Sequence, residues 1–219
     1  MNNPAVVAGI ILAAGESRRM GRDKALLPIG RERFLERLIH VLRWDVSPLL
    51  IVLGHHAAEI ESQVSGVMEP DRGFIVDPDP PDIIFLHNPE YPLGQLSSLK
   101  TAVRHLMNLQ VDAALVALVD HPAITREVVQ ALLDEFRRSA APVLIPTHQG
   151  RRGHPVIFSR GLFQELLDAP LEEGARAVVH HHAAETRFVE TAEAGILLDI
   201  DRPEDYETLT RMWTERDLK

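Results

Sequence analysis

A loop rich in glycine and arginine follows the first apolar run of the chain. Residues 12–24 read Leu-Ala-Ala-Gly-Glu-Ser-Arg-Arg-Met-Gly-Arg-Asp-Lys. Small residues after a buried strand let a ligand approach the backbone, and the exposed amides of such a loop can bind phosphate oxygens. Three arginines and a lysine add charge-assisted hydrogen bonds, which favour a polyphosphate over a neutral metabolite. We predict a polyphosphate site here, with a solvated basic loop as the alternative.

Four motifs of well-known nucleotide-binding and hydrolytic sites are absent from the sequence. Gly21 is not followed by Lys-Ser or Lys-Thr, so the loop is not a P-loop, and the Gly-x-Gly-x-x-Gly motif of dinucleotide binding does not occur. The sequence also lacks Gly-x-Ser-x-Gly and His-Glu-x-x-His, which would have indicated a serine hydrolase or a zinc protease.

Three aspartates are candidate oxygen ligands for a metal ion. Asp120 follows an apolar run, and open parallel sheets bind their ligands at the carboxyl ends of such strands. Asp199 and Asp201 would share one face of a strand, because side chains repeat every second residue. Two carboxylates that converge from separate strands suit Mg²⁺, which bridges phosphates and offsets their charge. The alternative roles are a helix cap for Asp120 and a surface cap for Asp199.

Two groups of histidines carry weaker hypotheses. His180, His181 and His182 are adjacent, so a helix would point them in different directions and only two of the three could share a metal. A metal site there is not favoured. His55 and His56 follow a predicted strand, where they would either line a substrate cleft or be solvated in a loop.

The elements that must position these residues alternate along the chain. Apolar or β-branched runs predict strands over residues 6–12, 49–53, 83–86, 113–119, 143–145, 155–158 and 187–191. Amphipathic spacing and capping residues predict helices over 34–42, 56–64, 99–109, 126–138, 162–167 and 203–215. Alternating strands and helices imply parallel pairing with right-handed crossovers. We therefore predict one α/β domain over residues 1–219, with three α/β/α layers around a mostly parallel sheet; the proline-rich stretch Pro70 to Pro81 is predicted to be a loop.

Composition narrows the class of protein. The 219 residues carry a formal net charge of −9, and this acid surplus argues against a nucleic-acid partner. The absence of cysteine excludes disulfides, iron–sulfur clusters and thiol nucleophiles, and it fits a cytoplasmic location. The apolar run 5–14 lacks a leading positive region and is too short for a membrane span. We expect neither a signal peptide nor a contact with a membrane.

Five motifs in order resemble the MobA-like nucleotidyltransferases, and within them the molybdenum cofactor cytidylyltransferase branch. Residues 12–24 match the family pattern Leu-Ala-Ala-Gly-x-Ser-x-Arg-Met-Gly-x-x-Lys at every fixed position. Residues 93–100 resemble its Gly-Met-x-x-Ser-Leu-Arg loop, and residues 119–122 resemble its Asp-x-Pro segment. Residues 150–155 are similar to Gly-x-x-Gly-His-Pro, and residues 199–205 to Asp-Ile-Asp-Thr-Pro-Glu-Asp. The chain departs from the family at His121, Arg202 and Lys100, where Gln, Thr and Arg are usual.

The resemblance implies a Rossmann-like nucleotidyltransferase fold of the glycosyltransferase-A type. It also implies transfer of CMP from CTP to a phosphorylated acceptor, a molybdopterin-type cofactor, with release of pyrophosphate. Cytidylyl rather than guanylyl transfer is expected because cytidylyl enzymes carry Ala-Ala-Gly where guanylyl enzymes tend to carry Ala-Gly-Gly. The product would pass to a molybdoenzyme or to its maturation factor. A sugar-phosphate or polyol-phosphate acceptor, or a nucleotide-binding module without activity, are the alternatives.

The resemblance also assigns roles to single residues. Catalytic roles fall to Lys24, Arg18 and Asp120. The cofactor Mg²⁺ would be held by Asp120, Asp201 and Asp199, and the acceptor would contact Gly153 and His154. The nucleoside triphosphate would contact a larger set, namely Leu12, Ala13, Ala14, Gly15, Ser17, Arg19, Gly21, Ser97 and Ser98.

Overall fold

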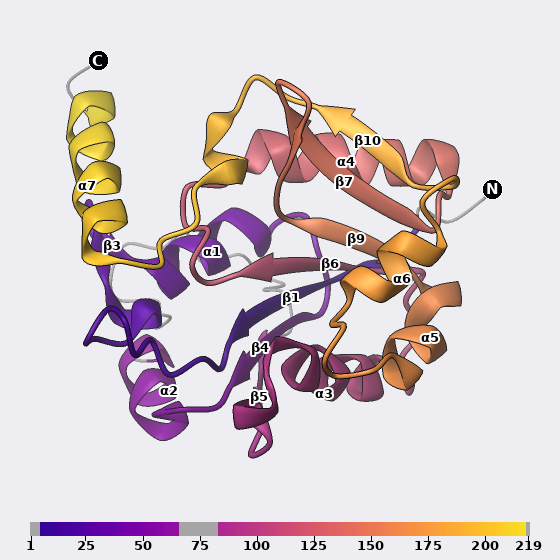
Figure 1. The fold of residues 1–219 in the computed structure, drawn as a ribbon, viewed down its shortest axis with the longest axis horizontal. Coiled ribbons are helices and arrows are strands. Elements are labelled where there is room, and N and C mark those ends of the chain that lie inside the picture. Colours follow the sequence, from indigo (N-terminus) through magenta and orange to yellow (C-terminus); the bar gives the residue numbers. More distant parts are fainter. Residues whose placement is uncertain (1–4, 66–82, 218–219) are drawn as a thin grey trace.

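A central sheet organises the part of the chain that the structure describes. The computed structural model describes residues 5–65 and 83–217 (Figure 1). The predicted loop from Pro70 to Pro81 lies outside these residues. The strand order is β10-β7-β9-β6-β1-β4-β5, with β8 paired to β7. The strands are β1 (Val7–Ala13), β4 (Leu49–Leu53), β5 (Ile83–His87), β6 (Ala113–Leu118), β7 (Val143–His148), β8 (Arg151–Arg152), β9 (Val156–Ser159) and β10 (Arg187–Glu190).

Most of the sheet is parallel, as predicted. The strands β6, β1, β4 and β5 pair in parallel, and β10 pairs in parallel with β7. Strand β9 runs antiparallel between β6 and β7, and β8 forms an antiparallel ladder with the end of β7. A separate two-stranded sheet joins β2 (Pro28–Ile29) to β3 (Glu32–Arg33).

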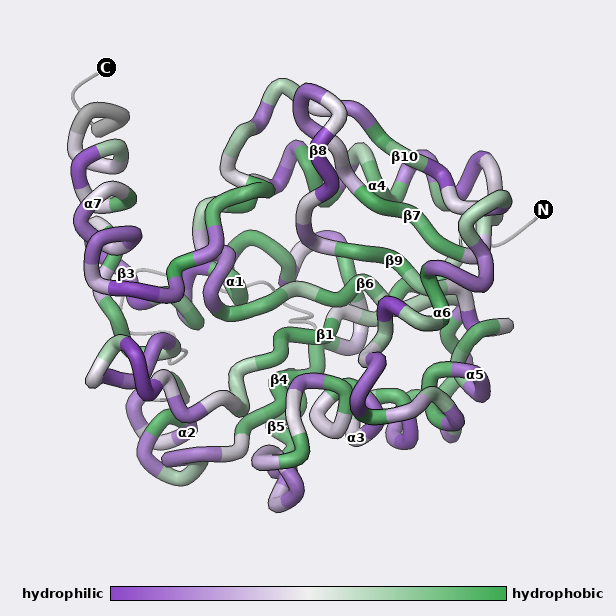
Figure 2. The backbone as a smooth tube through the Cα atoms, in the orientation of Figure 1, coloured by the Kyte–Doolittle hydropathy of each residue, from purple (hydrophilic) through white to green (hydrophobic). Residues whose placement is uncertain are grey.

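Side chains alternate between the two faces of the sheet and build one core on each. In β1, Ile11 and Ala13 belong to the first core, whereas Ile10 and Leu12 belong to the second. This period of two is the geometry of a strand that is buried on both faces. Figure 2 shows the resulting continuous hydrophobic stretches along β1, β4 and β6.

Helices cover both faces, which gives the three predicted layers. The first core takes residues from α1 (Phe34–Leu42), α2 (Ala57–Ser65), α4 (Arg126–Ser139) and α7 (Pro203–Asp217). The second takes residues from α3 (Gln95–Leu106), α5 (Phe163–Asp168) and α6 (Arg176–His181). Short 3₁₀ helices η1 (Lys24–Leu26), η3 (Tyr91–Leu93), η4 (Arg160–Leu162) and η5 (Ala194–Leu197) join these elements. Among the described residues, no helix combines the length and apolar character that a membrane crossing needs.

Three local expectations need correction. Helix α3 begins at Gln95, four residues before the predicted start, because Gly94 at φ 98° turns the chain out of η3 directly into the helix. Residues 199–201 are not a strand but the extended connection between η5 and α7. The short elements β8 and α6 were not predicted, since two to six residues carry too little periodicity to detect.

Candidate active site

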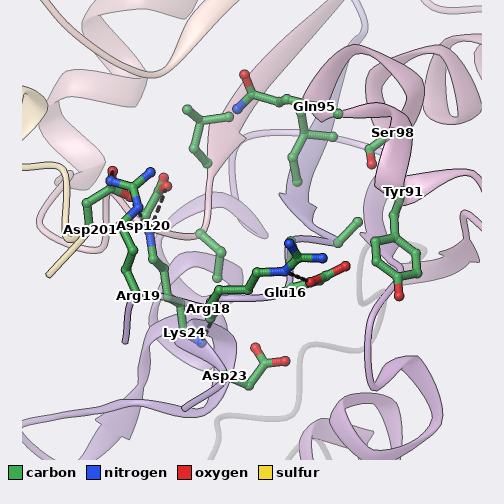
Figure 3. A pocket seen from close by; sticks show the side chains of 18 of the residues that line it. Glu16, Arg18, Arg19, Asp23, Lys24, Tyr91, Gln95, Ser98, Asp120 and Asp201 are labelled. Atoms are coloured by element: carbon green, nitrogen blue, oxygen red, sulfur yellow. Dashed lines mark hydrogen bonds and ion pairs between the residues drawn. The ribbon is translucent and has the colours of Figure 1, made fainter. Parts of the chain in front are cut away.

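A cavity of about 680 Å³ opens at the carboxyl ends of β1 and β6 (Figure 3). These strands are parallel neighbours, so Gly15 and Asp120, which follow them, lie at the same edge of the sheet as predicted. The glycine-rich loop, η3, the start of α3 and Asp201 complete the lining. In Figure 3, Lys24, Arg19, Asp120 and Asp201 gather on one side of the cavity, and Arg18, Glu16 and Tyr91 lie on the other.

The loop of residues 14–24 folds back on itself to place Lys24. Ser17 has a left-handed backbone (φ 51°), and its Oγ accepts a hydrogen bond from the Lys24 amide at 3.0 Å. Its carbonyl accepts from the Met20 amide at 2.9 Å. Gly21, at φ 65°, has open space around it, and so does Gly15. The Ser17 side chain therefore positions Lys24, a role that the sequence did not reveal.

The two predicted arginines of the loop have different partners. Arg18 is ion-paired with Glu16, and the Arg18 hydrogen bond lowers the pKa of the Glu16 carboxyl. The Arg18 side chain is 83% exposed, so its guanidinium stands at the mouth of the cavity. Arg19 donates a hydrogen bond to Asp201 Oδ2 at 2.7 Å. Arg19 therefore connects the loop to the segment that precedes α7.

Lys24 lies between two of the predicted metal-binding carboxylates. Its Nζ is 2.6 Å from Asp201 Oδ1 and 3.4 Å from Asp120 Oδ2. The side chain is only 11% exposed, so these contacts are shielded from water. The Lys24 hydrogen bond lowers the pKa of the Asp201 carboxyl. The structure thus brings Lys24, Asp120 and Asp201 together in one electrostatic cluster.

Asp199 lies close to Asp120 and His121. Ligand atoms of Asp120, His121 and Asp199 lie within 4.8 Å of one another. Asp199 is exposed on one side, but partial burial, with the nearby charges of Asp120 and Asp201, raises the pKa of its carboxyl. The amide of Ile200 donates to the Asp120 carbonyl at 2.9 Å, which holds this segment against the end of β6. Asp120 is not the residue before α4, because Thr125 occupies that position.

The oxygen ligands of this cluster include one that lacks a partner. Asp120 Oδ1 is buried and accepts no hydrogen bond from the described residues. A buried carboxylate oxygen without a donor costs free energy unless a cation or a ligand is present. Aspartate oxygens are the donors that Mg²⁺ prefers. The residues therefore fit a bound divalent cation of this type.

The two predicted serines have different positions. The Ser97 side chain is buried, and its Oγ lies 2.9 Å from the Glu90 carbonyl and 2.8 Å from the Gly94 carbonyl. Only Ser98 lines the cavity. The buried Asn88 donates to both hydroxyls, at 2.9 and 3.0 Å. Ser97 thus shapes the start of α3. Asn88, which directly follows β5, was not predicted to have a role.

Gly153 and His154 line a second cavity of about 480 Å³ next to the first. Both cavities are lined by Leu12, Gln95 and Leu118, so they are direct neighbours. A Cβ on Gly153 would lie 2.4 Å from the Ile196 carbonyl oxygen, so no larger residue fits there without a shift of backbone.

His154 lines the second cavity and lies close to His121. Its ring is 4.9 Å from the ring of His121, which itself approaches Asp120 and Asp199. Burial, reinforced by His121, lowers the pKa of His154 to about 4. The imidazole is therefore neutral at neutral pH, and it can offer a hydrogen bond without adding charge.

Comparison with known proteins identifies the family. A family model described as the MobA-like NTP transferase domain matches residues 9–186. The chain belongs to this family. It is a nucleotidyltransferase of the type that includes molybdenum cofactor cytidylyl- and guanylyltransferases. The fold is accordingly the Rossmann-like nucleotidyltransferase fold that the motifs implied.

Relatives of this MobA-like protein align along nearly its whole length. The Escherichia coli K12 molybdenum cofactor cytidylyltransferase is 28% identical over 94% of this chain and 96% of its own. A probable molybdenum cofactor guanylyltransferase of Mycobacterium avium is 26% identical over 94% of this chain and 95% of its own. The crystal structure of an Rv0371c homologue from Mycobacterium sp. strain JC1 superposes with a TM-score of 0.75, at 28% identity over 95% of this chain and 97% of that one.

Proposed function

We propose that this MobA-like protein transfers the CMP group of CTP to the phosphate of a molybdopterin-type acceptor and releases pyrophosphate. The observation that carries the proposal is the pair of neighbouring cavities. One is lined by charged side chains of the loop together with Asp120 and Asp201, and the other mainly by apolar side chains. A transferase needs its donor and its acceptor side by side, because positioning converts a bimolecular step into an effectively unimolecular one. The two cavities meet at Leu12, Gln95 and Leu118, which is where the phosphates of both substrates would meet.

The larger cavity suits the triphosphate. The backbone amides of the loop and the guanidiniums of Arg18 and Arg19, which line this cavity, would bind phosphate oxygens. Lys24 is the buried cation beside the carboxylates, so it is the group that would offset charge as it develops on the α-phosphate. An oxygen of the acceptor phosphate would form the new bond to the α-phosphorus while the bond to the β-phosphate breaks.

Asp120, Asp201 and Asp199 would hold Mg²⁺. When bound, the ion offsets phosphate charge and orients the triphosphate. Support comes from the unpartnered Asp120 Oδ1 and from the approach of Asp199 to Asp120. Asp201 lies beside them but is ion-paired with Lys24 and Arg19, so it would have to exchange a cationic partner for the ion. A solved structure of Rv0371c from Mycobacterium tuberculosis, which superposes with a TM-score of 0.71 at 24% identity over 94% of this chain, is a complex with manganese.

The second cavity suits an acceptor that combines a ring system with a phosphate. Leu99, Val116 and Phe158 give it apolar walls, which favour burial of a planar heterocycle. Arg152 and Arg176 line the same cavity and could bind an acceptor phosphate. Gly153 and His154 line this second cavity, which supports their proposed contact with the acceptor.

Pyrophosphate release from CTP and from GTP, with and without molybdopterin, tests this proposal. We expect release that requires both CTP and molybdopterin, and little release with sugar phosphates or polyol phosphates. Asp120→Asn and Asp201→Asn should each raise the Mg²⁺ concentration that gives half-maximal rate. Release with a polyol phosphate but not with molybdopterin would instead establish the alternative acceptor. Unchanged metal dependence in both variants would refute the carboxylate site.

A further inference from the structure

A second cluster of ligand-type side chains lies beside the nucleotide loop. It joins Asp23, which directly precedes Lys24, to His55 and His56, which follow β4. Ligand atoms of the three residues lie within 4.8 Å of one another. Asp23 also lines the larger cavity, so the cluster forms one flank of the candidate nucleotide site (Figure 3 shows Asp23).

Two polar atoms of this cluster are buried without a partner. The Asp23 side chain is only 8% exposed. Its Oδ1 accepts a hydrogen bond from the Ala25 amide at 3.0 Å, but its Oδ2 has no hydrogen-bond partner in the described part of the chain. The same holds for His55 Nδ1. An unpaired buried carboxylate oxygen is costly, so this arrangement calls for a bound cation or donor.

The spacing of these atoms matches metal ligation better than a hydrogen bond. His56 Nδ1 lies 3.7 Å from Asp23 Oδ2, which is beyond hydrogen-bond range. Two ligand atoms on a tetrahedral Zn²⁺, each about 2.0 to 2.1 Å from the ion, lie about 3.3 Å apart. A shift of a few tenths of an ångström would therefore bring both atoms onto one ion. Two imidazoles with one carboxylate favour Zn²⁺ and similar transition metals over Mg²⁺.

The backbone around the two histidines is held in this arrangement by close packing. A Cβ on Gly54 would lie 2.7 Å from the Ala14 carbonyl oxygen and 2.6 Å from Tyr91 Cβ, so only glycine allows the approach. The His55 amide donates to the same Ala14 carbonyl at 3.2 Å. His56 has φ 54°, a left-handed conformation that is costly for a residue other than glycine. These contacts hold the turn after β4 against the nucleotide loop.

We propose that Asp23, His55 and His56 form a binding site for a transition-metal ion, separate from the aspartate cluster at the strand ends. Such an ion would tie the nucleotide loop to the turn between β4 and α2, next to Lys24. The proposal concerns metal binding to the free protein, so it stands independently of the proposed nucleotidyl transfer.

Another histidine cluster provides the matched control. His181 Nδ1 and His182 Nε2 each lie 2.8 Å from an oxygen of Glu165. Both oxygens of that carboxylate are therefore partnered, and ion pairing alone accounts for the contacts. The three adjacent histidines do not all point to one site, as the sequence predicted. His181 and His182 share Glu165, whereas His180 is exposed.

The experiment is a titration with Zn²⁺ by calorimetry, using protein without a histidine tag, nucleotide or magnesium. We compare the wild type, His55→Gln/His56→Gln, Asp23→Asn and His181→Gln/His182→Gln. The first two variants should bind one Zn²⁺ fewer than the wild type, or bind it about 100-fold more weakly, since even outer-shell changes cost 10–100-fold. The His181/His182 variant should keep that site. Co²⁺ absorption spectra should show imidazole ligation that disappears in the same two variants.

The result that would overturn the proposal is equal stoichiometry and affinity in the wild type and in both variants of the cluster. Loss of the site only in the His181/His182 variant would also overturn it. Asp23→Asn keeps a side-chain oxygen that can accept the hydrogen bond from the Ala25 amide at the start of η1, so this variant should fold. Its Zn²⁺ binding therefore tests the proposal if the double histidine variant does not fold. Circular dichroism in the absence of metal checks that each variant retains the fold.

Discussion

Lys24 Nζ lies 2.6 Å from Asp201 Oδ1, although 177 residues separate them in the chain. The predicted phosphate-binding cation and a predicted metal-binding carboxylate are therefore in direct contact. Arg19 bonds the other oxygen of Asp201 at 2.7 Å, so two cations of the loop share this one carboxylate. The contact couples the position of the nucleotide loop to the segment before α7.

Removal of the Lys24 charge should nearly abolish turnover. Lys24→Ala is expected to lower kcat by about 10²–10³, the cost of losing a fixed group that stabilises transition-state charge. Arg22→Ala is the matched control, because Arg22 is exposed on the same loop and should leave kcat near the wild-type value. Initial rates of pyrophosphate release at saturating substrates make the comparison. An unchanged kcat in Lys24→Ala would remove this residue from the mechanism.

Asp201 should stabilise the fold at neutral pH and cease to do so in acid. Lys24 lowers the pKa of this carboxyl in the folded state. Its contribution is therefore present above the unfolded pKa of about 3.9 and is lost as the pH falls through the lowered folded value. Without metal, Asp201→Asn should be less stable than the wild type at pH 7, and the difference should shrink below about pH 4. Urea unfolding across this range measures it.

The stability difference between Asp199→Asn and the wild type should depend on pH in the opposite direction. Asp199→Asn is therefore the control for Asp201→Asn. Burial raises the pKa of Asp199, so its ionised form is disfavoured in the fold. Wild-type stability is expected to fall as the pH rises through the unfolded pKa towards the raised folded value. Asp199→Asn should therefore gain stability relative to the wild type over that window. The same pH trend in both variants would show that Lys24 does not distinguish the two carboxyls.

The methyl group of Ala14 should favour cytosine over guanine. Ala14 lines the larger cavity and is 5% exposed, so its methyl narrows the space available to the base. Ala14→Gly should reduce the preference for CTP over GTP, measured as the ratio of kcat/KM values, by about tenfold to a hundredfold. A wild-type preference for GTP would refute the role of residue 14.

A side chain at position 153 should distort the wall of the second cavity. Gly153→Ala places a Cβ 2.4 Å from the Ile196 carbonyl oxygen, and such overpacking typically lowers the free energy of unfolding by about 1–3 kcal/mol. Gly161→Ala is the control, since its nearest neighbour, Ser159 Oγ, would be 3.8 Å away. Urea unfolding should separate the two variants. Equal stability of the two variants would mean that the backbone at Ile196 can move to accommodate the added methyl group at little cost in free energy.

Local sequence patterns determined most of the elements and the nature of the loop. The runs in β1, β4 and β6 are recognisable because every residue of a strand buried on both faces is apolar. The glycine and arginine content of residues 12–24 predicts a phosphate-binding loop because backbone amides and nearby cations act locally. A helix start such as Gln95 was missed because three of the first four residues of α3 are polar, namely Gln95, Ser97 and Ser98.

The tertiary structure alone decided which of these residues meet. Sheet order places β1 between β4 and β6, so the loop after β1 faces both the turn with His55 and the strand end with Asp120. The pairing of Lys24 with Asp201 and the second cavity beside Gly153 likewise bring together segments that are far apart in the chain. Such contacts join distant residues, and no local periodicity specifies them, because they arise only when the faces of the sheet are buried against its helices.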